Sequence, residues 1–336
     1  MIKRLILLLF VFSSVMLFST EEVKAQDPEF TQFYAAPLYL NPAFAGSARC
    51  PRVTLNYRNQ WPSIPRAFVT SAASYDQHVD AISGGIGIMV MTDKAGEANY
   101  NMTTVSGIYS YQLNVSRNFS IKTAIQATYV QRFLDWDKLN FGDEIDPRFG
   151  FVYQTLEQRT DNNKNYVDFS AGIIGFSSQV YGGFAANHLT EPDEAFIVQG
   201  SSPIPMKLTA HVGAMLPVAG SDVDDLDDGT FISPNAMYQQ QDKFNTMNVG
   251  VYVLHSPLVG GLWYRGSFDD DSFLFSDSFI ALVGLQKGIF KVGYSYDVTV
   301  SELSNVAAGS HEITMGLQFD CRPRKRRTRV IRCPQF

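Results

Sequence analysis

The sequence is short of charged residues and of cysteine. Only 18% of its 336 residues are charged, against about a quarter in ordinary globular chains, which argues against a disordered or nucleic-acid-coating protein. The mean hydropathy of −0.07 also argues against several membrane-spanning helices, because each needs about 20 consecutive apolar residues. Aromatic side chains are abundant instead, with 25 Phe and 16 Tyr beside 25 Gly. This composition is typical of β-sheet with tight turns.

The first 25 residues are predicted to be a secretory signal peptide. Lys3 and Arg4 precede an apolar run from Leu5 to Phe18, and Val23-Lys24-Ala25 provides small residues at the cleavage positions. We expect the mature chain to begin at Gln26, which is not the cysteine that a lipoprotein requires. The exported chain then carries 24 basic and 31 acidic residues, a net charge of −7.

Export places the three cysteines in an oxidising compartment. Cys50, Cys321 and Cys333 allow one disulfide, with three possible pairings. Neither the spacing of Cys321 and Cys333 nor any nearby histidine matches a zinc site. We therefore predict no metal site and no cofactor.

Polar and apolar residues alternate with a period of two along the mature chain, which predicts strands. Between residues 118 and 132, for example, Phe119, Ile121 and Ile125 share one face, while Lys122 and Gln126 share the other. No long helical pattern competes. About fourteen such segments follow one another, near 52–61, 67–77, 84–92, 98–113, 117–133, 165–177, 179–188, 205–217, 229–241, 245–255, 258–268, 277–287, 289–299 and 308–319.

An even strand number is the rule for single-chain outer-membrane barrels, in which both termini return to the periplasmic side. We therefore predict an all-β fold, a closed antiparallel transmembrane β-barrel over residues 52–320. A periplasmic segment, 26–51, precedes it, and a basic periplasmic tail, 321–336, follows it. The connections 113–117, 177–179, 255–258 and 287–289 are short and would face the periplasm. The connections 133–165, 188–205, 268–277 and 299–308 are longer and would face outside.

The alternative to a barrel is a secreted β-sandwich or propeller, which also uses short alternating strands. Sandwich proteins of this length usually divide into modules joined by linkers, but no linker appears between residues 52 and 319. Aromatic residues also stand near predicted strand ends, where the interfacial girdles of a barrel belong: Trp61, Tyr75, Tyr100, Phe133, Trp136, Trp263 and Tyr264.

Closure of the barrel predicts a disulfide at its seam. Cys50 directly precedes the first strand and Cys321 directly follows the last. These strands are neighbours in a closed barrel, with these ends on the same side. A Cys50–Cys321 bond would therefore join them, and a Cys321–Cys333 bond is the rival pairing.

Eight short segments form an ordered set of motifs along the mature chain: Gln26-Asp27-Pro28-Glu29-Phe30-Thr31-Gln32-Phe33, Leu40-Asn41-Pro42-Ala43-Phe44-Ala45-Gly46, Arg58-Asn59-Gln60-Trp61, Ser83-Gly84-Gly85-Ile86-Gly87, Asp168-Phe169-Ser170-Ala171-Gly172, Ala186-Asn187-His188-Leu189, Gly293-Tyr294-Ser295-Tyr296-Asp297 and Gly309-Ser310-His311-Glu312-Ile313. In this order they resemble the PorP/SprF family of type IX secretion membrane proteins. The resemblance implies an outer-membrane barrel that helps to export or tether large surface adhesins and gliding proteins. The basic tail and the acidic segment 221–229 differ from the bulk of the family.

The family segments supply the candidate partner-contact residues. Pro42 fixes φ and cannot donate to a strand ladder, so the Asn41-Pro42 segment either plugs or braces the barrel or simply positions the first strand. Polar residues near strand ends either line the barrel or contact a partner. The full candidate set is Asn41, Pro42, Gly46, Arg58, Trp61, Asn187, His188, Tyr294, Tyr296, Asp297, His311 and Glu312.

The same residues argue against an enzyme. Only His311 has a serine and a carboxylate beside it, Ser310 and Glu312, and adjacent residues of a strand point to opposite faces. The acidic segment 221–229 departs from the ligand spacing of a calcium loop and is predicted to be a solvated turn. The seven positive charges of the tail would contact anionic lipid or an acidic partner, or stay solvated.

Two function classes follow from these observations. The first is a non-catalytic outer-membrane component of type IX secretion and gliding. Its expected partners are the C-terminal domain of a secreted adhesin, other components of the secretion machinery and outer-membrane lipid, but not nucleic acid. The alternative is a porin or a ligand-specific solute channel.

Overall fold

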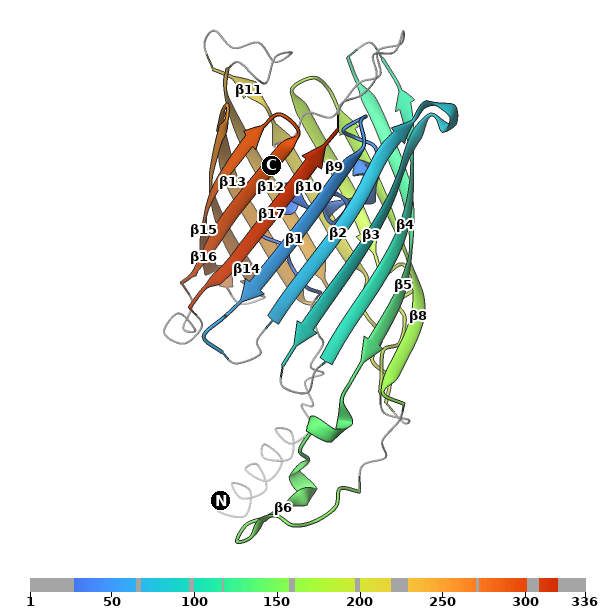
Figure 1. The fold of residues 1–336 in the computed structure, drawn as a ribbon, viewed down its shortest axis with the longest axis vertical. Coiled ribbons are helices and arrows are strands. Elements are labelled where there is room, and N and C mark those ends of the chain that lie inside the picture. Colours follow the sequence, from blue (N-terminus) through green and yellow to red (C-terminus); the bar gives the residue numbers. More distant parts are fainter. Residues whose placement is uncertain are drawn as a thin grey trace, which may run out of the picture.

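The chain forms one large antiparallel sheet that closes into a barrel (Figure 1). The computed structural model describes residues 27–64, 68–96, 100–116, 118–156, 161–196, 200–218, 229–269, 272–300 and 308–319. The predicted signal peptide, most of the acidic segment 221–229 and the basic tail 321–336 lie outside the described residues. Among the described residues, none of the helices has the length and apolarity to cross a membrane.

Fourteen long strands build the barrel wall, as the period of two predicts. The sheet contains fifteen named segments, but β10 and β11 pair in succession with the same neighbour, β12, and form one position in the wall. The segments are β1 (Arg52–Gln60), β2 (Phe68–Val79), β3 (Gly84–Ala95), β4 (Tyr100–Asn114), β5 (Ser120–Phe133), β8 (Asn163–Phe176), β9 (Val180–Asn187), β10 (Lys207–Ala214), β11 (Leu216–Pro217), β12 (Thr230–Gln241), β13 (Phe244–His255), β14 (Leu258–Asp269), β15 (Ser272–Lys287), β16 (Phe290–Thr299) and β17 (Ser310–Gln318).

The barrel closes where the first strand meets the last. β1 pairs antiparallel with β17 over its whole length, from Arg52 opposite Gln318 to Gln60 opposite Ser310. Every strand of the wall therefore has a partner on both sides, so the sheet has no free edge. The predicted closed barrel of fourteen strands is confirmed.

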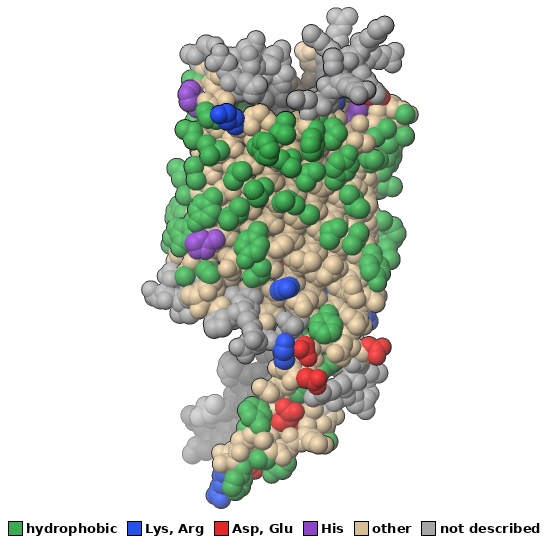
Figure 2. All heavy atoms as spheres, in the orientation of Figure 1, with side chains coloured by type: hydrophobic (Ala, Val, Ile, Leu, Met, Phe, Trp, Pro, Cys, Tyr) green, Lys and Arg blue, Asp and Glu red, His purple; other side chains and the backbone are tan. Residues whose placement is uncertain are grey.

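Alternation along each strand separates a polar lumen from an apolar outer wall. On β5, for example, Lys122 and Gln126 are buried inside, while Ile125 is 67% exposed on the outside. Figure 2 shows apolar side chains over most of the visible wall, the surface that an outer-membrane barrel presents to lipid.

Three predicted girdle residues are misplaced. Trp263 points inward from the middle of β14 and is only 4% exposed. Tyr100 lies on the inward face of β4, where its hydroxyl accepts from Arg132, and Trp136 is buried in the connection after β5.

The two longest connections lie at one end of the barrel. That end also has the short connections 242–243 and 270–271, and the other end has the longer connection 218–229. Short turns at 177–179, 256–257 and 288–289 share one end with Cys50 and Phe319, which flank the barrel strands. The opposite end carries the longer connections 134–162 and 188–206. We refer to these as the short-turn end and the long-loop end. The predicted long connection 268–277 is wrong, because β14 continues to Asp269 and β15 begins at Ser272.

Residues 27–50 fill the lumen, and we call them the plug (Figure 1). The plug contains η1 (Phe33–Ala35), α2 (Pro37–Leu40) and η2 (Pro42–Phe44). It starts beside strand ends at the long-loop end, where Asp27 contacts His188. It reaches the short-turn end, where the backbone N–H of His78 donates to the carbonyl oxygen of Arg49. The segment predicted to lie periplasmic to the barrel therefore lies inside it.

The remaining small elements belong to the connections. η3 (Asp80–Ile82) follows β2, and the connection between β5 and β8 contains η4 (Trp136–Lys138), η5 (Gly142–Glu144) and a hairpin of β6 (Ile145–Asp146) and β7 (Gly150–Phe151). β6 and β7 pair only with each other and are separate from the barrel wall. This connection projects away from the barrel in Figure 1.

The barrel seam brings the sequence before β1 close to the sequence after β17. The backbone N–H of Phe319 donates to the carbonyl oxygen of Pro51 at 2.9 Å. Cys50 is disulfide-bonded. Cys321, the predicted partner, lies outside the described residues, so the pairing stays a prediction.

Candidate functional site

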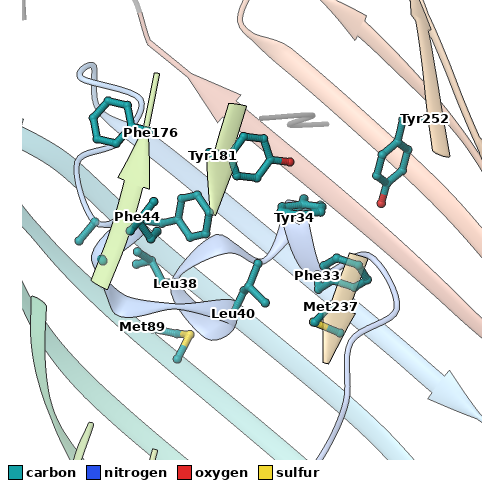
Figure 3. Close-up of a cluster of buried hydrophobic side chains, with 14 of the residues drawn as sticks. Phe33, Tyr34, Leu38, Leu40, Phe44, Met89, Phe176, Tyr181, Met237 and Tyr252 are labelled. Atoms are coloured by element: carbon teal, nitrogen blue, oxygen red, sulfur yellow. The ribbon is translucent and has the colours of Figure 1, made fainter. Parts of the chain in front are cut away.

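The plug is anchored in the lumen first by aromatic packing (Figure 3). Phe33 stacks edge-on against Trp263 of β14, with ring centroids 4.7 Å apart, and Tyr34 packs against Tyr181 of β9 at 5.7 Å. Phe44 is fully buried and stacks on His211 of β10 at 5.4 Å. Side chains from the plug and from strands around the wall thus form one apolar core, whose burial is the main non-specific force that holds the plug.

Asn41 adds a specific lock. Its side-chain amide donates to the carbonyl oxygens of Ile173 (3.3 Å) and Phe184 (3.2 Å), and its Oδ1 accepts the backbone N–H of Ala43 at 2.9 Å. The last bond caps η2, whose first residue is Pro42. The wall makes room at Gly172, where a Cβ would lie 2.1 Å from Asn41 Oδ1. The candidate pair Asn41-Pro42 therefore braces the plug against β8 and β9.

Gly46 holds the other end of the plug. Its φ of +66° favours glycine, and a Cβ there would lie 2.7 Å from the Cα of Gly85. Its backbone N–H donates to Asp76 Oδ2 at 2.7 Å. Asp76 in turn pairs with Arg52 at 2.8 Å, and both side chains are buried. A larger residue at Gly46 would separate the plug from β2 and β3.

A buried charge cluster ties the start of the plug to the barrel seam. Arg58 of β1 lies opposite Glu312 of β17; its guanidinium is 3.3 Å from the Glu312 carboxylate and 3.0 Å from that of Asp297 on β16. Glu312 Oε2 and Oε1 accept the backbone N–H groups of Thr31 (2.6 Å) and Gln32 (2.9 Å). The carboxylate therefore has both a charged partner and peptide donors, the condition under which a buried charge is stable.

Arg265 of β14 extends this cluster. Its Nη1 is 3.5 Å from Asp297 Oδ2, and its Nη2 donates to Thr31 Oγ1 at 3.1 Å. Glu29 of the plug is 3.8 Å away. Two arginines and two wall carboxylates thus surround the polar side chain of Thr31.

A second ionic cluster fixes the first residue of the plug at the long-loop end. His188, which follows β9, lies between two carboxylates: its Nδ1 is 2.7 Å from Asp168 and its Nε2 is 2.8 Å from Asp27. Burial opposes charge on this imidazole, but the two carboxylates outweigh it and raise the pKa of His188 to about 10. Burial likewise acts to raise the pKa of Asp27, but the charges of His188 and Lys207 lower it. The ring is therefore a cation that donates from both nitrogens.

Three candidate residues lie on the outer face and contact no plug residue in the described structure. Tyr294 is 40% exposed outside the barrel, and its hydroxyl is 2.8 Å from His311 Nδ1. The ring of Tyr296 packs on His311 at 4.9 Å. Alternation explains the division, because Asp297 and Glu312 are adjacent to these residues and point inward. His311 therefore does not line the lumen, which is one of the two roles considered for polar residues near strand ends.

The other two candidates stand at strand ends. Trp61 follows β1 with a φ of +57°. Its backbone N–H donates to the carbonyl oxygen of Gly309 at 2.9 Å, and its ring packs on Phe68. Asn187 ends β9 and lines a cavity beside the plug. That cavity has a volume of about 80 Å³, room for only a few water molecules. Among the described residues, no group of three or more His, Cys, Asp or Glu side chains is placed to hold a metal ion.

Several site residues are not in the candidate set. Arg265 shares the inward face with Trp263, two positions away, and alternation alone would have found it had Trp263 been assigned to the lumen. Lys207 and His211 both lie on the inward, buried face of β10. Thr31 and Gln32 lie within a family segment, but the sequence contains no signal that they contact Glu312, some 280 residues later.

A family model for the type IX secretion system membrane protein PorP/SprF matches residues 22–317. The chain belongs to the PorP/SprF family. It is therefore an outer-membrane component of type IX secretion, and family membership implies association with that machinery. The matched range includes the plug and every strand of the barrel wall except the last residue of β17.

Solved structures with a similar fold are outer-membrane barrels of low sequence identity. The outer membrane protein Omp33 of Acinetobacter baumannii is 9% identical, with a TM-score of 0.45, covering 82% of this chain and 100% of that chain. A FadL homologue of Pseudomonas aeruginosa is 11% identical, with a TM-score of 0.44, covering 85% and 94%. No curated protein matches the sequence.

Proposed function

We propose that this PorP/SprF protein is a non-catalytic barrel that holds a large secreted adhesin at the cell surface or supports its export during type IX secretion and gliding. The N-terminal signal peptide directs it out of the cytoplasm, and the barrel inserts in the outer membrane. The adhesin's C-terminal domain and other components of the secretion machinery are its partners. The basic tail contacts anionic lipid or an acidic periplasmic partner.

The plug is the observation that carries this proposal over the alternative of a porin. A solute channel needs an open lumen, whereas here 24 residues of the chain's own sequence occupy it through an aromatic core, the Asn41 lock and two buried ionic clusters. Departure of the plug would separate Asp27 from His188. It would also remove the N–H groups of Thr31 and Gln32 from the buried Glu312 carboxylate. Buried charges that lose such partners are unfavourable, so these contacts oppose spontaneous opening of a path. A barrel filled in this way is suited to holding a partner rather than conducting solutes.

A deletion strain separates the two functions. We expect loss of the gene to abolish surface display of one or a few large exported proteins, identified by comparing surface proteomes with the parent strain, while uptake of small hydrophilic solutes is unchanged. Purified protein in a planar bilayer should show no steady conductance. Normal surface display in the deletion strain, with reduced solute uptake and an open channel in bilayers, would favour the porin.

A further inference from the structure

The connection between β5 and β8 carries an exposed apolar cluster at the long-loop end of the barrel. We call this cluster the loop tip and define it by six side chains. Leu156 is 90% exposed, Phe149 77% and Phe151 61%. Tyr153, Val152 and Ile145 complete the cluster, with exposed fractions between 48% and 60%. Single exposed apolar residues are ordinary, but a contiguous apolar patch marks a site of interaction.

The loop tip stands on an ordered base. Trp136 is 6% exposed and stacks on Phe141 at 6.3 Å. Asp143 accepts the backbone N–H of Leu156 at 2.7 Å, and Asp146 accepts that of Phe149 at 3.0 Å. These bonds turn the backbone so that its large apolar side chains face water. The exposure is therefore a consequence of a formed structure.

Charge limits what can cover the loop tip. Between residues 134 and 156 the chain has five acidic and two basic residues, a net charge of −3. Figure 2 shows acidic side chains close to the apolar ones on the projecting loop. The N–H groups of Arg148 and Phe149 lower the pKa of Asp146, so its charge persists at neutral pH. An anionic lipid surface or a second copy of this loop would bring like charges together.

We propose that the loop tip docks the exported surface protein, on a folded face with an apolar centre and a basic rim. This inference rests on the proposed function and on the long-loop end facing outward. Tyr and Phe are the residue types that dominate the centres of protein interfaces. The acidic side chains around the loop tip then orient the partner and speed its encounter, because they attract the basic residues at the edge of its binding face.

The test uses the exported protein whose surface display depends on this gene. In an otherwise normal strain, the full-length barrel is changed at Phe149→Ser, Phe151→Ser and Leu156→Ser. The control variant carries Asn140→Ser and Gln154→Ser, two exposed polar positions of the same loop. The exported protein is then purified and its affinity for each detergent-solubilised barrel is measured.

We expect the apolar variant to bind about tenfold or more weakly, the loss that follows from truncating central interface residues, and the control to bind like the wild type. Binding by the wild type should weaken as salt rises, because the rim charges are screened. Equal binding by the apolar variant would overturn the proposal. So would a variant that loses only self-association, or only its contact with lipid vesicles, while it still binds the exported protein.

The deletion strain keeps this result distinct from the proposed function. If deletion leaves surface display unchanged, the proposed function itself fails. If deletion abolishes display but the apolar variant restores it fully and binds normally, the proposed function stands and only the docking site is wrong.

Discussion

The backbone N–H of Gln32 donates to the carboxylate of Glu312 at 2.9 Å, although the two residues are 280 positions apart. One belongs to the plug and the other to the last strand of the barrel. The same carboxylate pairs with Arg58 across the seam. Closure of the barrel and retention of the plug therefore depend on one buried group.

Glu312→Gln should loosen the plug. The substitution removes the negative charge beside Arg58 and places an amide N–H₂ near the N–H donors of Thr31 and Gln32. We expect a loss of about 3–5 kcal/mol, the usual effect of breaking a buried ion pair. The measurement is the temperature at which the folded barrel unfolds in detergent. His311→Gln is the matched control, because the adjacent His311 faces outward, and an equal loss in both variants would contradict the role of Glu312.

The His188 cluster predicts a pH window. The pKa of His188 is raised in the folded protein, so its contribution is complete below the ordinary pKa of about 6.5 and is lost as pH rises through about 10. The pKa of Asp27 is lowered, so its contribution is present above its ordinary value of about 3.8 and falls below it. Relative to His188→Gln, the unfolding temperature of the wild type should therefore decrease between about pH 6.5 and about pH 10 and change little above that range. Parallel pH profiles for the two proteins would exclude this cluster as the cause.

The Asn41 lock depends on the absence of a side chain at Gly172. Gly172→Ala places a methyl group 2.1 Å from the present position of Asn41 Oδ1, so either the plug shifts or the wall bends, at a cost of about 1–3 kcal/mol. Gly107→Ala in β4 is the control, since a Cβ there meets nothing within 4 Å. Planar-bilayer recordings should show conductance events for Gly172→Ala and not for Gly107→Ala. Absence of conductance in both variants would mean that the plug stays in the lumen despite the added methyl group.

Alternation was sufficient to predict the barrel but not its contents. The inward and outward faces of β5 and β14 follow from residue order, because a strand residue points opposite to its neighbour. Trp263 was misassigned since an aromatic residue suits both a membrane interface and a packed lumen. Pro42 and Gly46 marked the plug as irregular, yet both a plug and a simple turn need such residues.

The site could not be predicted because its contacts join distant strands. Arg58 contacts Glu312 only because β1 pairs with β17 in one particular register. No local sequence pattern predicts the register between these two strands. Tyr294 and Asp297 belong to one family segment and His311 to another. Because of the pleat, Asp297 points into the lumen, whereas Tyr294 and His311 point outward. A family segment therefore mixes residues of the lumen with residues of the outer wall.

The outer face of β5 offers a test of the membrane-spanning band. Ile125 lies near the middle of the strand and is 67% exposed. Ile125→Arg would place a charge near the bilayer midplane and should destabilise the barrel by about 2–4 kcal/mol. Gln131→Arg lies on the same face near the strand end, where the expected effect is at most about 1 kcal/mol. Unfolding of both variants in lipid vesicles by urea checks the difference; equal losses would place Gln131 at the same depth as Ile125.

Orientation in the membrane decides which partner can reach each end. If the short-turn end faces the periplasm, Asn140 in the long loop lies outside the cell and Asn118 in the turn before β5 lies beneath the membrane. A membrane-impermeant maleimide applied to intact cells should label Asn140→Cys strongly and Asn118→Cys only after the outer membrane is permeabilised, with the parent protein as background for Cys50, Cys321 and Cys333. Labelling of Asn118→Cys alone on intact cells would show that the barrel has the opposite orientation in the membrane. The plug would then begin at the periplasmic mouth, and the loop tip would face the periplasmic machinery instead of an exported protein.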